Sequence, residues 1–273
     1  NGGIKAMFSI GGINYAYVAY VDGMCASARI ISLSSNNIVL QLPCLSKSDV
    51  DLNGVGGGWL KLSDNEILFS TGTPTSAHVE NEINQLAQDD NSLWGKILKL
   101  TIENDNITAE IFTKGHRNPQ GITNIEGDII AVEHGPMGGD EINLIIKNNN
   151  YEWPLQSLGS EYDLNEINKS YSNSIDTNLP IFSFVPSIGI SDANVCPKNY
   201  SEYYAPNKCV AISSMRGNSI YFVVYNKNKA LFTEKIELGS RIRKLFVKGN
   251  QIIAVTDYEG IITGRLFKGW VNK

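Results

Sequence analysis

Three parts of the chain gather residue types that bind metal ions and anions. Residues 115–121, Gly-His-Arg-Asn-Pro-Gln-Gly, read as a polar turn that enters a strand. Residues 133–143 hold carboxylates among glycines, and Asn-Tyr-Glu-Trp-Pro follows at residues 150–154. Arg241 and Arg243 stand two positions apart near the end of the chain. Carboxylates suit a hard cation and guanidiniums suit carboxylates, so the three parts together indicate a site for a metal ion and an anion.

The acidic part, residues 133–143, carries Glu133, Asp140 and Glu141. The glycines between them let the backbone turn sharply, which would bring carboxylates and free carbonyl oxygens around one point. Oxygen ligands of this kind suit calcium. The alternative is an acidic loop that faces solvent, and composition alone slightly favours that alternative.

The paired arginines alternate along a predicted strand, so Arg241 and Arg243 would face the same side. Two guanidiniums on one face can bind a carboxylate-rich ligand in bidentate fashion. An exposed polar strand face explains the same pair. Arg117 is likewise compatible with a structural arginine that hydrogen-bonds within its own turn.

The elements that must position these residues are short strands. Runs rich in β-branched and aromatic residues are separated by a few Gly, Asn, Ser or Asp residues, a texture typical of hairpins. A repeated unit of turn, strand, polar turn and strand predicts the four-stranded blades of a β-propeller, with a β-sandwich as the alternative. The predicted units span residues 8–42, 57–114, 120–152, 181–238 and 241–269.

Two stretches interrupt the strand pattern. Residues 154–180 show little periodicity and are predicted to lie between two blades. Residues 79–88 carry weak helical periodicity and predict a short loop helix.

Composition excludes two classes of partner. The 273-residue chain has a net charge of −5 and shows no Lys/Arg cluster with interleaved aromatic residues, so nucleic acid and anionic membranes are not expected partners. The longest apolar runs, such as residues 15–21, are too short to span a bilayer, so we expect no membrane span.

The four cysteines allow three pairings, of which two local bridges are the simplest. Cys25 and Cys44 flank a predicted strand pair, while Cys196 and Cys209 bracket a loop. Free buried thiols are the alternative. Disulfides persist in oxidising compartments, so two such bridges predict a periplasmic or secreted protein. The chain starts at Asn-Gly-Gly rather than at methionine, and we expect that a leader or N-terminal segment has been removed.

Taken together, these segments resemble the soluble glucose/sorbosone (aldose sugar) dehydrogenases, which are six-bladed propellers that use pyrroloquinoline quinone (PQQ) with calcium. The resemblance covers nearly the whole chain. The stretches that carry it are residues 57–60, 87–99, 115–121, 133–143, 184–187, 214–217 and 240–244. It implies an all-β fold, a six-bladed β-propeller of four-stranded antiparallel blades, as a single domain over residues 1–273. The first blade is then absent from this chain and would be cut off or supplied by a second chain.

The resemblance also implies roles for individual residues around the quinone. Arg117 and Asn118 would contact it, and Arg216 would reach it from a neighbouring turn. Arg241 and Arg243 would clamp its carboxylates. Several cations in a preorganised site suit a quinone that carries three carboxylates.

Two calcium sites are implied as well. The backbone carbonyls of Gly135 and Pro136 would hold the calcium that belongs to the cofactor. Glu141 and Tyr151 would hold a second, structural calcium.

The sequence departs from the family at the general base. A histidine is expected just before the Gly-Gly that opens the second blade, and Val55 stands there. Valine cannot accept a proton, so this position offers no evident source of general-base catalysis, which contributes roughly 10²–10⁴-fold in rate. Asp51 is the substitute base that the nearby sequence offers. His78 lies in a Thr/Ser-rich loop and is expected to be a solvated surface residue.

Two hypotheses for function follow. The first is an oxidoreductase, a quinoprotein-type sugar dehydrogenase that oxidises an aldose at C1 with PQQ and calcium and takes a small sugar as substrate. The second is a catalytically inactive, calcium-stabilised propeller that binds a carbohydrate ligand or a protein. Val55 favours the second hypothesis, and the full set of anion-binding positions favours the first.

Overall fold

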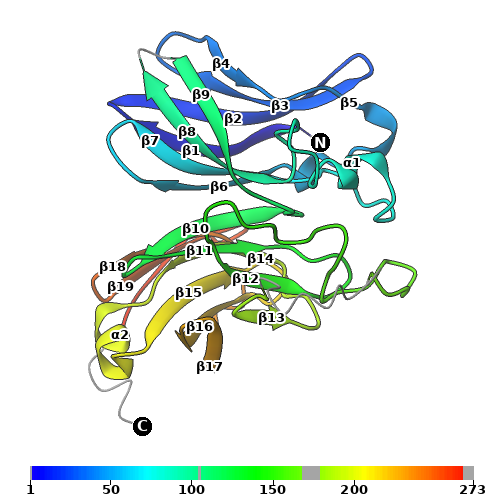
Figure 1. The fold of residues 1–273 in the computed structure, drawn as a ribbon. Coiled ribbons are helices and arrows are strands. Elements are labelled where there is room, and N and C mark those ends of the chain that lie inside the picture. Colours follow the sequence, from blue (N-terminus) through cyan, green and yellow to red (C-terminus); the bar gives the residue numbers. More distant parts are fainter. Residues whose placement is uncertain (1, 104–105, 168–178, 267–273) are drawn as a thin grey trace. The chain divides into compact units, whose positions relative to one another are not determined.

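A computed structural model describes residues 2–103, 106–167 and 179–266 of the chain (Figure 1). Within these ranges nearly all regular structure is antiparallel β-sheet, with two short helices, α1 (Glu82–Gln85) and α2 (Lys198–Tyr204). Neither helix in the described part of the chain is long and apolar enough to cross a membrane.

The chain divides into two compact units, which we describe separately. The first unit comprises Asn1–Pro119, Gly135–Met137 and Ile146–Asn178. The second unit comprises Gln120–His134, Gly138–Ile145 and Leu179–Lys273.

The first unit contains two sheets. One has the strand order β1 (Gly3–Ile10), β2 (Ile13–Asp22), β3 (Cys25–Ser32), β4 (Ile38–Gln41), with the short β5 (Leu45–Ser46) also paired to β3. The other has the order β6 (Gly56–Lys61), β7 (Glu66–Thr71), β8 (Lys96–Glu103), β9 (Asn106–Lys114).

The core of the first unit follows from the alternation of its strands. Successive residues point to opposite faces of a sheet, so apolar residues at every second position form a continuous buried surface. Tyr15, Tyr17, Phe69 and Trp94 are the largest fully buried members of this core. β1 shows this alternation, whereas β7 is buried at five consecutive residues, so the core also includes strands that are covered on both faces.

The second unit contains three sheets. The first has the order β10 (Pro119–Ile125), β11 (Asp128–Glu133), β12 (Asp140–Leu144), β13 (Phe182–Phe184). The second has the order β14 (Ile190–Val195), β15 (Lys208–Ser214), β16 (Ser219–Asn226), β17 (Lys229–Glu237). The third has three strands, β18 (Ile242–Lys248), β19 (Gln251–Thr256) and β20 (Ile261–Arg265).

The prediction of an all-β chain built from four-stranded antiparallel blades is confirmed. The blade count differs from the prediction, because the described residues form five sheets rather than six with one absent. The proposal that a second chain supplies a sixth blade stays a prediction, as does the single domain.

One boundary was wrong. Residues 154–180 were predicted to lie between blades, but β13 pairs with β12 as the fourth strand of its sheet. The chain therefore leaves and re-enters the same blade. The physical reason is that β13 is too short to show a strand period in the sequence.

Both predicted disulfides are present. Cys25–Cys44 joins the start of β3 to the residue before β5, and Cys196–Cys209 closes the loop that contains α2. Their Cα–Cα distances are 5.3 Å and 5.6 Å, within the ordinary range for a bridge. The predicted loop helix is confirmed as α1, whereas α2 was not predicted.

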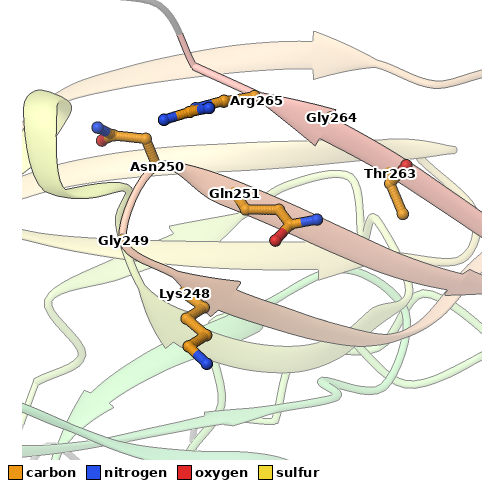
Figure 2. A pocket seen from close by; sticks show the side chains of 7 residues that line it. All are labelled: Lys248, Gly249, Asn250, Gln251, Thr263, Gly264 and Arg265. Carbon is orange, nitrogen blue, oxygen red and sulfur yellow. The ribbon is translucent and has the colours of Figure 1, made fainter.

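The last sheet also carries an open cavity of about 750 Å³ (Figure 2). The β18–β19 turn and the end of β20 line it, with Lys248, Gln251 and Arg265 among the lining residues. None of the residues predicted to bind a metal or a cofactor belongs to this cavity.

Candidate functional site

In the first unit, the start of the turn at Lys114 and Gly115 packs against residues 150–154. The Trp153 amide donates to the Gly115 carbonyl at 3.0 Å, and the Tyr151 amide donates to the Lys114 carbonyl at 2.9 Å. Gly115 has φ 78°, and a Cβ at this position would meet the Asn150 side-chain oxygen and lie 2.6 Å from the Glu152 nitrogen. Only glycine permits this approach, so Gly115 brings two of the predicted segments together.

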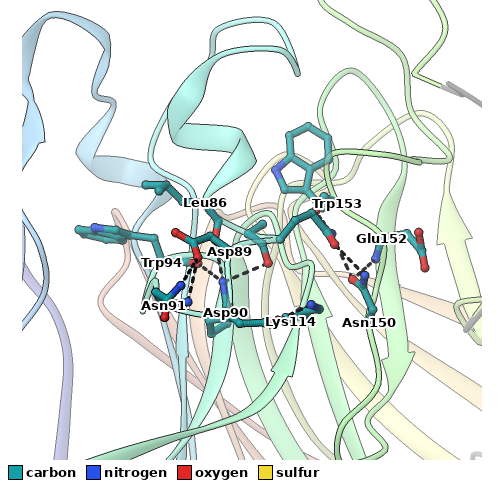
Figure 3. A network of polar contacts seen from close by, with 12 residues as sticks. Leu86, Asp89, Asp90, Asn91, Trp94, Lys114, Asn150, Glu152 and Trp153 are labelled. Carbon is teal, nitrogen blue, oxygen red and sulfur yellow. Dashed lines mark hydrogen bonds and ion pairs between the residues drawn. The ribbon is translucent and has the colours of Figure 1, made fainter.

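Polar side chains hold this junction in place (Figure 3). Gln88 donates to the Trp153 carbonyl at 2.6 Å and exchanges hydrogen bonds with the Asn150 amide at 2.7 Å and 3.1 Å. Lys114 forms an ion pair with Asp90 at 2.8 Å. These contacts fix the backbone that presents Arg117 and Asn118.

Lys96 organises the loop beneath the junction. Its side chain is fully buried, and Nζ donates to the carbonyls of Leu86, Ala87 and Trp94 at 2.7, 3.0 and 2.8 Å. Three short contacts satisfy the three donors of an ammonium group. Lys96 is therefore a structural cation of the scaffold.

Arg117 and Gly135 lie in direct contact in the first unit. Arg117 Nη1 donates to the Gly135 carbonyl oxygen at 2.8 Å. The guanidinium carbon lies 5.4 Å from the centre of the Trp153 ring, and Nη2 donates to the Tyr162 hydroxyl at 3.3 Å. Arg117, which is predicted to bind the quinone, thus contacts Gly135, which is predicted to bind calcium. The buried Pro136 follows Gly135 in the chain.

Asn118 is buried and holds the loop that leads into β6. Its Oδ1 accepts from the Gly56 amide at 3.1 Å, and its Nδ2 lies 3.5 Å from the Asn53 carbonyl oxygen. Both ends of the amide thus engage the loop that contains Val55. The structure gives Asn118 a positioning role, while its contact with a quinone stays a prediction.

At the expected position of the base, the Val55 side chain is fully buried in the core of the first unit. Its carbonyl accepts a hydrogen bond from the Tyr17 hydroxyl at 3.0 Å. Burial raises the pKa of Tyr17, so this hydroxyl stays protonated. Asp51 is exposed, and its carboxylate accepts from the Asn53 backbone and side chain at 3.0 Å and 2.9 Å.

The histidines of the first unit have different environments. The His78 side chain is 65% exposed, with Nδ1 3.8 Å from the buried Glu161 carboxylate. His116 is buried, with Nε2 2.8 Å from the Thr113 hydroxyl and its ring stacked on Tyr151. His78 is therefore a surface residue as predicted, and His116 supports the turn.

Tyr151, a predicted ligand of the structural calcium, is anchored in the same unit. Its hydroxyl accepts from the Ile146 amide at 2.9 Å, and its ring centre lies 4.7 Å from that of His116. The side chain is therefore held by its neighbours.

In the second unit, the acidic residues of β11 and β12 separate into two sets. Glu133 and Glu141 are register partners, and Asn143 Nδ2 donates to both carboxylates at 3.0 Å and 3.1 Å. Burial and the neighbouring charge of Glu133 raise the pKa of Glu141 to about 8. A cation beside this pair would offset both effects.

Asp140 has a different role. Its Oδ2 accepts from the amides of Ile188 and Ile190, each at 3.0 Å, and it lies 3.8 Å from His134. It therefore fixes the connection between β13 and β14.

Over residues 2–103, 106–167 and 179–266, no group of three or more His, Cys, Asp or Glu side chains is arranged to hold a metal ion. One predicted calcium site uses the backbone carbonyls of Gly135 and Pro136, and the other uses a single carboxylate, Glu141, with Tyr151. They are therefore not of the kind that such a group would form.

The paired arginines of the second unit face one side, as predicted, and both grip Asp257. Arg241 Nε lies 2.9 Å from Oδ2, while Arg243 Nε lies 2.6 Å from Oδ1 and its Nη2 lies 3.1 Å from Oδ2. The hydrogen bond from Arg243 has the largest effect on the pKa of Asp257 and lowers it. Burial raises this pKa, but the hydrogen bond from Arg241 lowers it again, so the pKa lies below its usual value. Arg241 and Arg243 thus bind one carboxylate together, and we call this pair the carboxylate clamp.

Arg216 and Arg241 line one open cavity of about 260 Å³ in the second unit, together with Met215 and Tyr258. Arg216 is exposed and follows β15 in a turn whose amides bond to the Ile188 carbonyl. Met215 also touches the clamp, since its sulfur lies 2.9 Å from Arg243 Nη1. Two of the predicted cofactor ligands therefore line one cavity, and a third, Arg243, contacts Met215 in its wall.

Sequence reasoning missed two participants, Asp257 and Tyr162. The first could have been found, because a β18–β19 hairpin register that pairs Ile242 with Thr256 places Asp257 opposite Arg241. Tyr162 lies in a stretch without periodicity, and no sequence signal links it to Arg117.

Comparison with known proteins gives one family. The Glucose / Sorbosone dehydrogenase family model matches residues 37–264. The chain is 33% identical over 199 residues to an uncharacterized protein of Synechocystis sp. and 31% identical over 180 residues to the aldose sugar dehydrogenase YliI of Escherichia coli. These alignments cover 67% and 60% of this chain and 48% of each relative, so the chain spans about half the length of the curated relatives it matches.

Two solved structures show the fold. A crystal structure of glucose dehydrogenase matches with a TM-score of 0.73 and 21% identity, covering 96% of this chain and 82% of that one. The PQQ-bound form of aldose sugar dehydrogenase from Streptomyces coelicolor matches with a TM-score of 0.63 and 18% identity, covering 92% and 74%. At these identities the likeness concerns the fold alone.

Proposed function

The chain belongs to the glucose/sorbosone dehydrogenase family, and on that premise we propose that it acts as a quinoprotein-type sugar dehydrogenase that oxidises an aldose at C1 with PQQ and calcium. The name of the Escherichia coli relative supports an aldose as substrate. The name of another relative, the quinoprotein glucose dehydrogenase B of Acinetobacter calcoaceticus, 39% identical over 92 residues, supports a quinone as the cofactor.

The observation that carries this proposal is the carboxylate clamp of the second unit. Arg241 and Arg243 converge on one carboxylate, and Arg241 shares a cavity with Arg216. Charge-assisted bidentate contacts of this kind are the strong ones, and they suit a ligand that carries carboxylates. Arg216, Arg241 and Arg243 would bind the quinone, and the contacts of Arg117 and Asn118 with it stay predictions.

The residues present also fit calcium. The Gly135 carbonyl already accepts a hydrogen bond from a cationic group, so its oxygen is oriented toward positive charge. Glu141 is a buried carboxyl beside a second carboxyl, an arrangement that a hard cation stabilises. Gly135 and Pro136 would hold the calcium of the cofactor, and Glu141 and Tyr151 a structural one. When bound, the quinone would accept the hydride from C1, with calcium polarising it.

Proton transfer is the weakest part of the chemistry that this chain offers. Val55 cannot take the proton of the anomeric hydroxyl. Asp51 is the candidate base, because it is an exposed carboxylate on the loop that precedes β6. Its two hydrogen bonds from Asn53 hold the carboxylate in place at the start of this loop.

The alternative function is a catalytically inactive, calcium-stabilised propeller that binds carbohydrate or protein. The burial of Val55 favours it, because a side chain at the position of the base is sequestered in the core. The two functions differ in whether bound quinone is reduced by a sugar.

The experiment is reconstitution of the purified protein with PQQ and calcium chloride. We expect the absorption spectrum of bound quinone, and reduction of a dye when glucose is added as the probe substrate. Asp51→Asn is expected to abolish dye reduction and to leave the spectrum unchanged. Failure to bind PQQ at any calcium concentration would refute the dehydrogenase proposal, while binding without turnover would support the alternative.

We also propose a location outside the reducing cytosol, either periplasmic or secreted. The two disulfides support it, because such bridges persist in oxidising compartments. Fractionation of cells that express the full-length gene, with thiol labelling of the recovered protein, tests it. Recovery in the cytosol with four reactive thiols would contradict it.

A further inference from the structure

The contact between Arg117 and Gly135 places a positive charge where a metal ligand is expected. Arg117 Nη1 donates to the Gly135 carbonyl oxygen at 2.8 Å. Both residues belong to the first unit. The same oxygen is the one that, under the proposed function, would coordinate calcium.

Two further contacts hold the guanidinium in this position. Its carbon lies 5.4 Å from the centre of the Trp153 ring, within cation–π range. Its Nη2 donates to the hydroxyl of Tyr162, whose side chain is largely exposed. The Trp153 indole in turn donates to the Thr73 hydroxyl at 3.0 Å, so the ring under Arg117 is itself fixed. The guanidinium is thus held on three sides.

Calcium and this guanidinium cannot share the oxygen without a penalty. Calcium coordinates oxygen at 2.3–2.6 Å, so an ion on the Gly135 carbonyl would stand within roughly 5 Å of the Arg117 nitrogen. The carbonyl has a lone pair for each partner, but the two positive charges repel at this separation. The repulsion therefore weakens calcium binding for as long as Arg117 contacts this carbonyl.

We propose that Arg117 competes with calcium for the Gly135 carbonyl, so that the protein binds calcium weakly until an anion draws the guanidinium away. Under the proposed function, on which this inference rests, that anion is the quinone, whose carboxylates attract Arg117. Quinone and calcium then bind as a coupled pair. Coupling of binding is reciprocal, so calcium raises the affinity for quinone by the same factor.

The test is a calcium titration of the purified protein without quinone, followed by calorimetry. Arg117→Met removes the charge and both donors while keeping a long apolar side chain over Trp153. We expect the affinity for calcium to rise about tenfold, within the usual range for coupling between two sites. Each titration is repeated in a Glu141→Gln background, so that the predicted structural calcium does not contribute.

The matched control is Arg265→Met, which removes the same charge from an exposed position of the second unit. We expect its calcium affinity to stay within twofold of the original protein. A second variant covers the case in which Arg117→Met does not fold. Tyr162→Phe removes one anchor of the guanidinium from an exposed position, and we expect a two- to threefold gain in calcium affinity.

An unchanged or lower calcium affinity in Arg117→Met and Tyr162→Phe would overturn the inference, as would an equal gain in Arg265→Met. The fate of the proposed function is read separately from the quinone spectrum of the original protein. A protein that never binds PQQ, but whose Arg117→Met variant gains calcium affinity, would refute the function and retain the competition at Gly135.

Discussion

Each unit contains arginines that are predicted to bind the cofactor, but they are held differently. Arg117 contacts a backbone carbonyl, an aromatic ring and a hydroxyl. Arg241 and Arg243 share the Asp257 carboxylate. In the second unit, Asp257 binds the arginines that are expected to bind a carboxylate of the ligand. In the first unit, Arg117 binds the carbonyl that is expected to bind a metal ion. Each unit therefore fills its ligand positions with groups of its own, of the same charge as the ligand.

The largest effect should come from breaking the clamp. Arg241→Met with Arg243→Met removes several charge-assisted hydrogen bonds to a quinone carboxylate, each worth about 1.5–3 kcal/mol. We expect the affinity for PQQ to fall at least a hundredfold in an absorbance titration. Replacing the exposed Lys248 and Arg265 by methionine removes two cations elsewhere in the same unit and is the control. An equal loss in both double variants would mean that net charge, rather than the clamp, binds the quinone.

The acidic pair of the second unit should make stability depend on pH. The pKa of the Glu141 carboxyl is about 8 in the folded chain, against a usual value of 4.5. The folded state therefore keeps a proton that the unfolded state loses, and the free energy of unfolding falls as pH rises from about 4.5 to 8. We expect a fall on the order of 2–4 kcal/mol in denaturant unfolding.

Glu141→Gln should remove most of this pH dependence, because glutamine does not titrate. Saturating calcium should also reduce it in the original protein, since the ion stabilises the ionised pair. A slope that persists unchanged in Glu141→Gln would place its origin in other groups.

Releasing the clamp from its internal partner should sharpen the comparison. Asp257→Asn keeps the shape of the side chain and removes the charge that competes with a quinone carboxylate. We expect the affinity for PQQ to rise about tenfold, equivalent to roughly 1.4 kcal/mol. If Asp257 instead positions the arginines for the ligand, the affinity for PQQ will fall. Asp257 would then not compete with a ligand in the way proposed for Arg117.

The smallest effect should come from Tyr162. Its hydroxyl makes a 3.3 Å hydrogen bond to Arg117, and its side chain is 56% exposed. We expect Tyr162→Phe to change the free energy of unfolding by less than about 1 kcal/mol, as measured by thermal denaturation. A larger loss would mean that this contact supports the fold rather than the orientation of the guanidinium.

Strand content and most blade boundaries could be predicted because they depend on local patterns. Runs of β-branched and aromatic residues, as at 15–21, and polar turns between such runs, as at 248–251, mark the strands and their hairpins. The assignment failed where local pattern is absent. β13 spans only Phe182–Phe184, and its pairing with β12 across a long excursion is set by tertiary contact.

The candidate site shows the same division. That Arg241 and Arg243 share a face follows from the two-residue period of a strand, and it is confirmed by their common partner. The contact of Arg117 with Gly135 joins residues that are 18 positions apart, and no pattern in the sequence encodes it. The assignment of Asn118 to a quinone overlooked the loop at Asn53 and Gly56, which its amide holds.

The buried ammonium of Lys96 has a consequence for handling the protein. It holds the carbonyls of Leu86, Ala87 and Trp94 together as a bound metal ion would, but it is covalently attached to the chain. A chelator that strips calcium during purification cannot extract it. The loop under Gly115 should therefore survive such treatment, so that metal-free material still presents Arg117 for reconstitution.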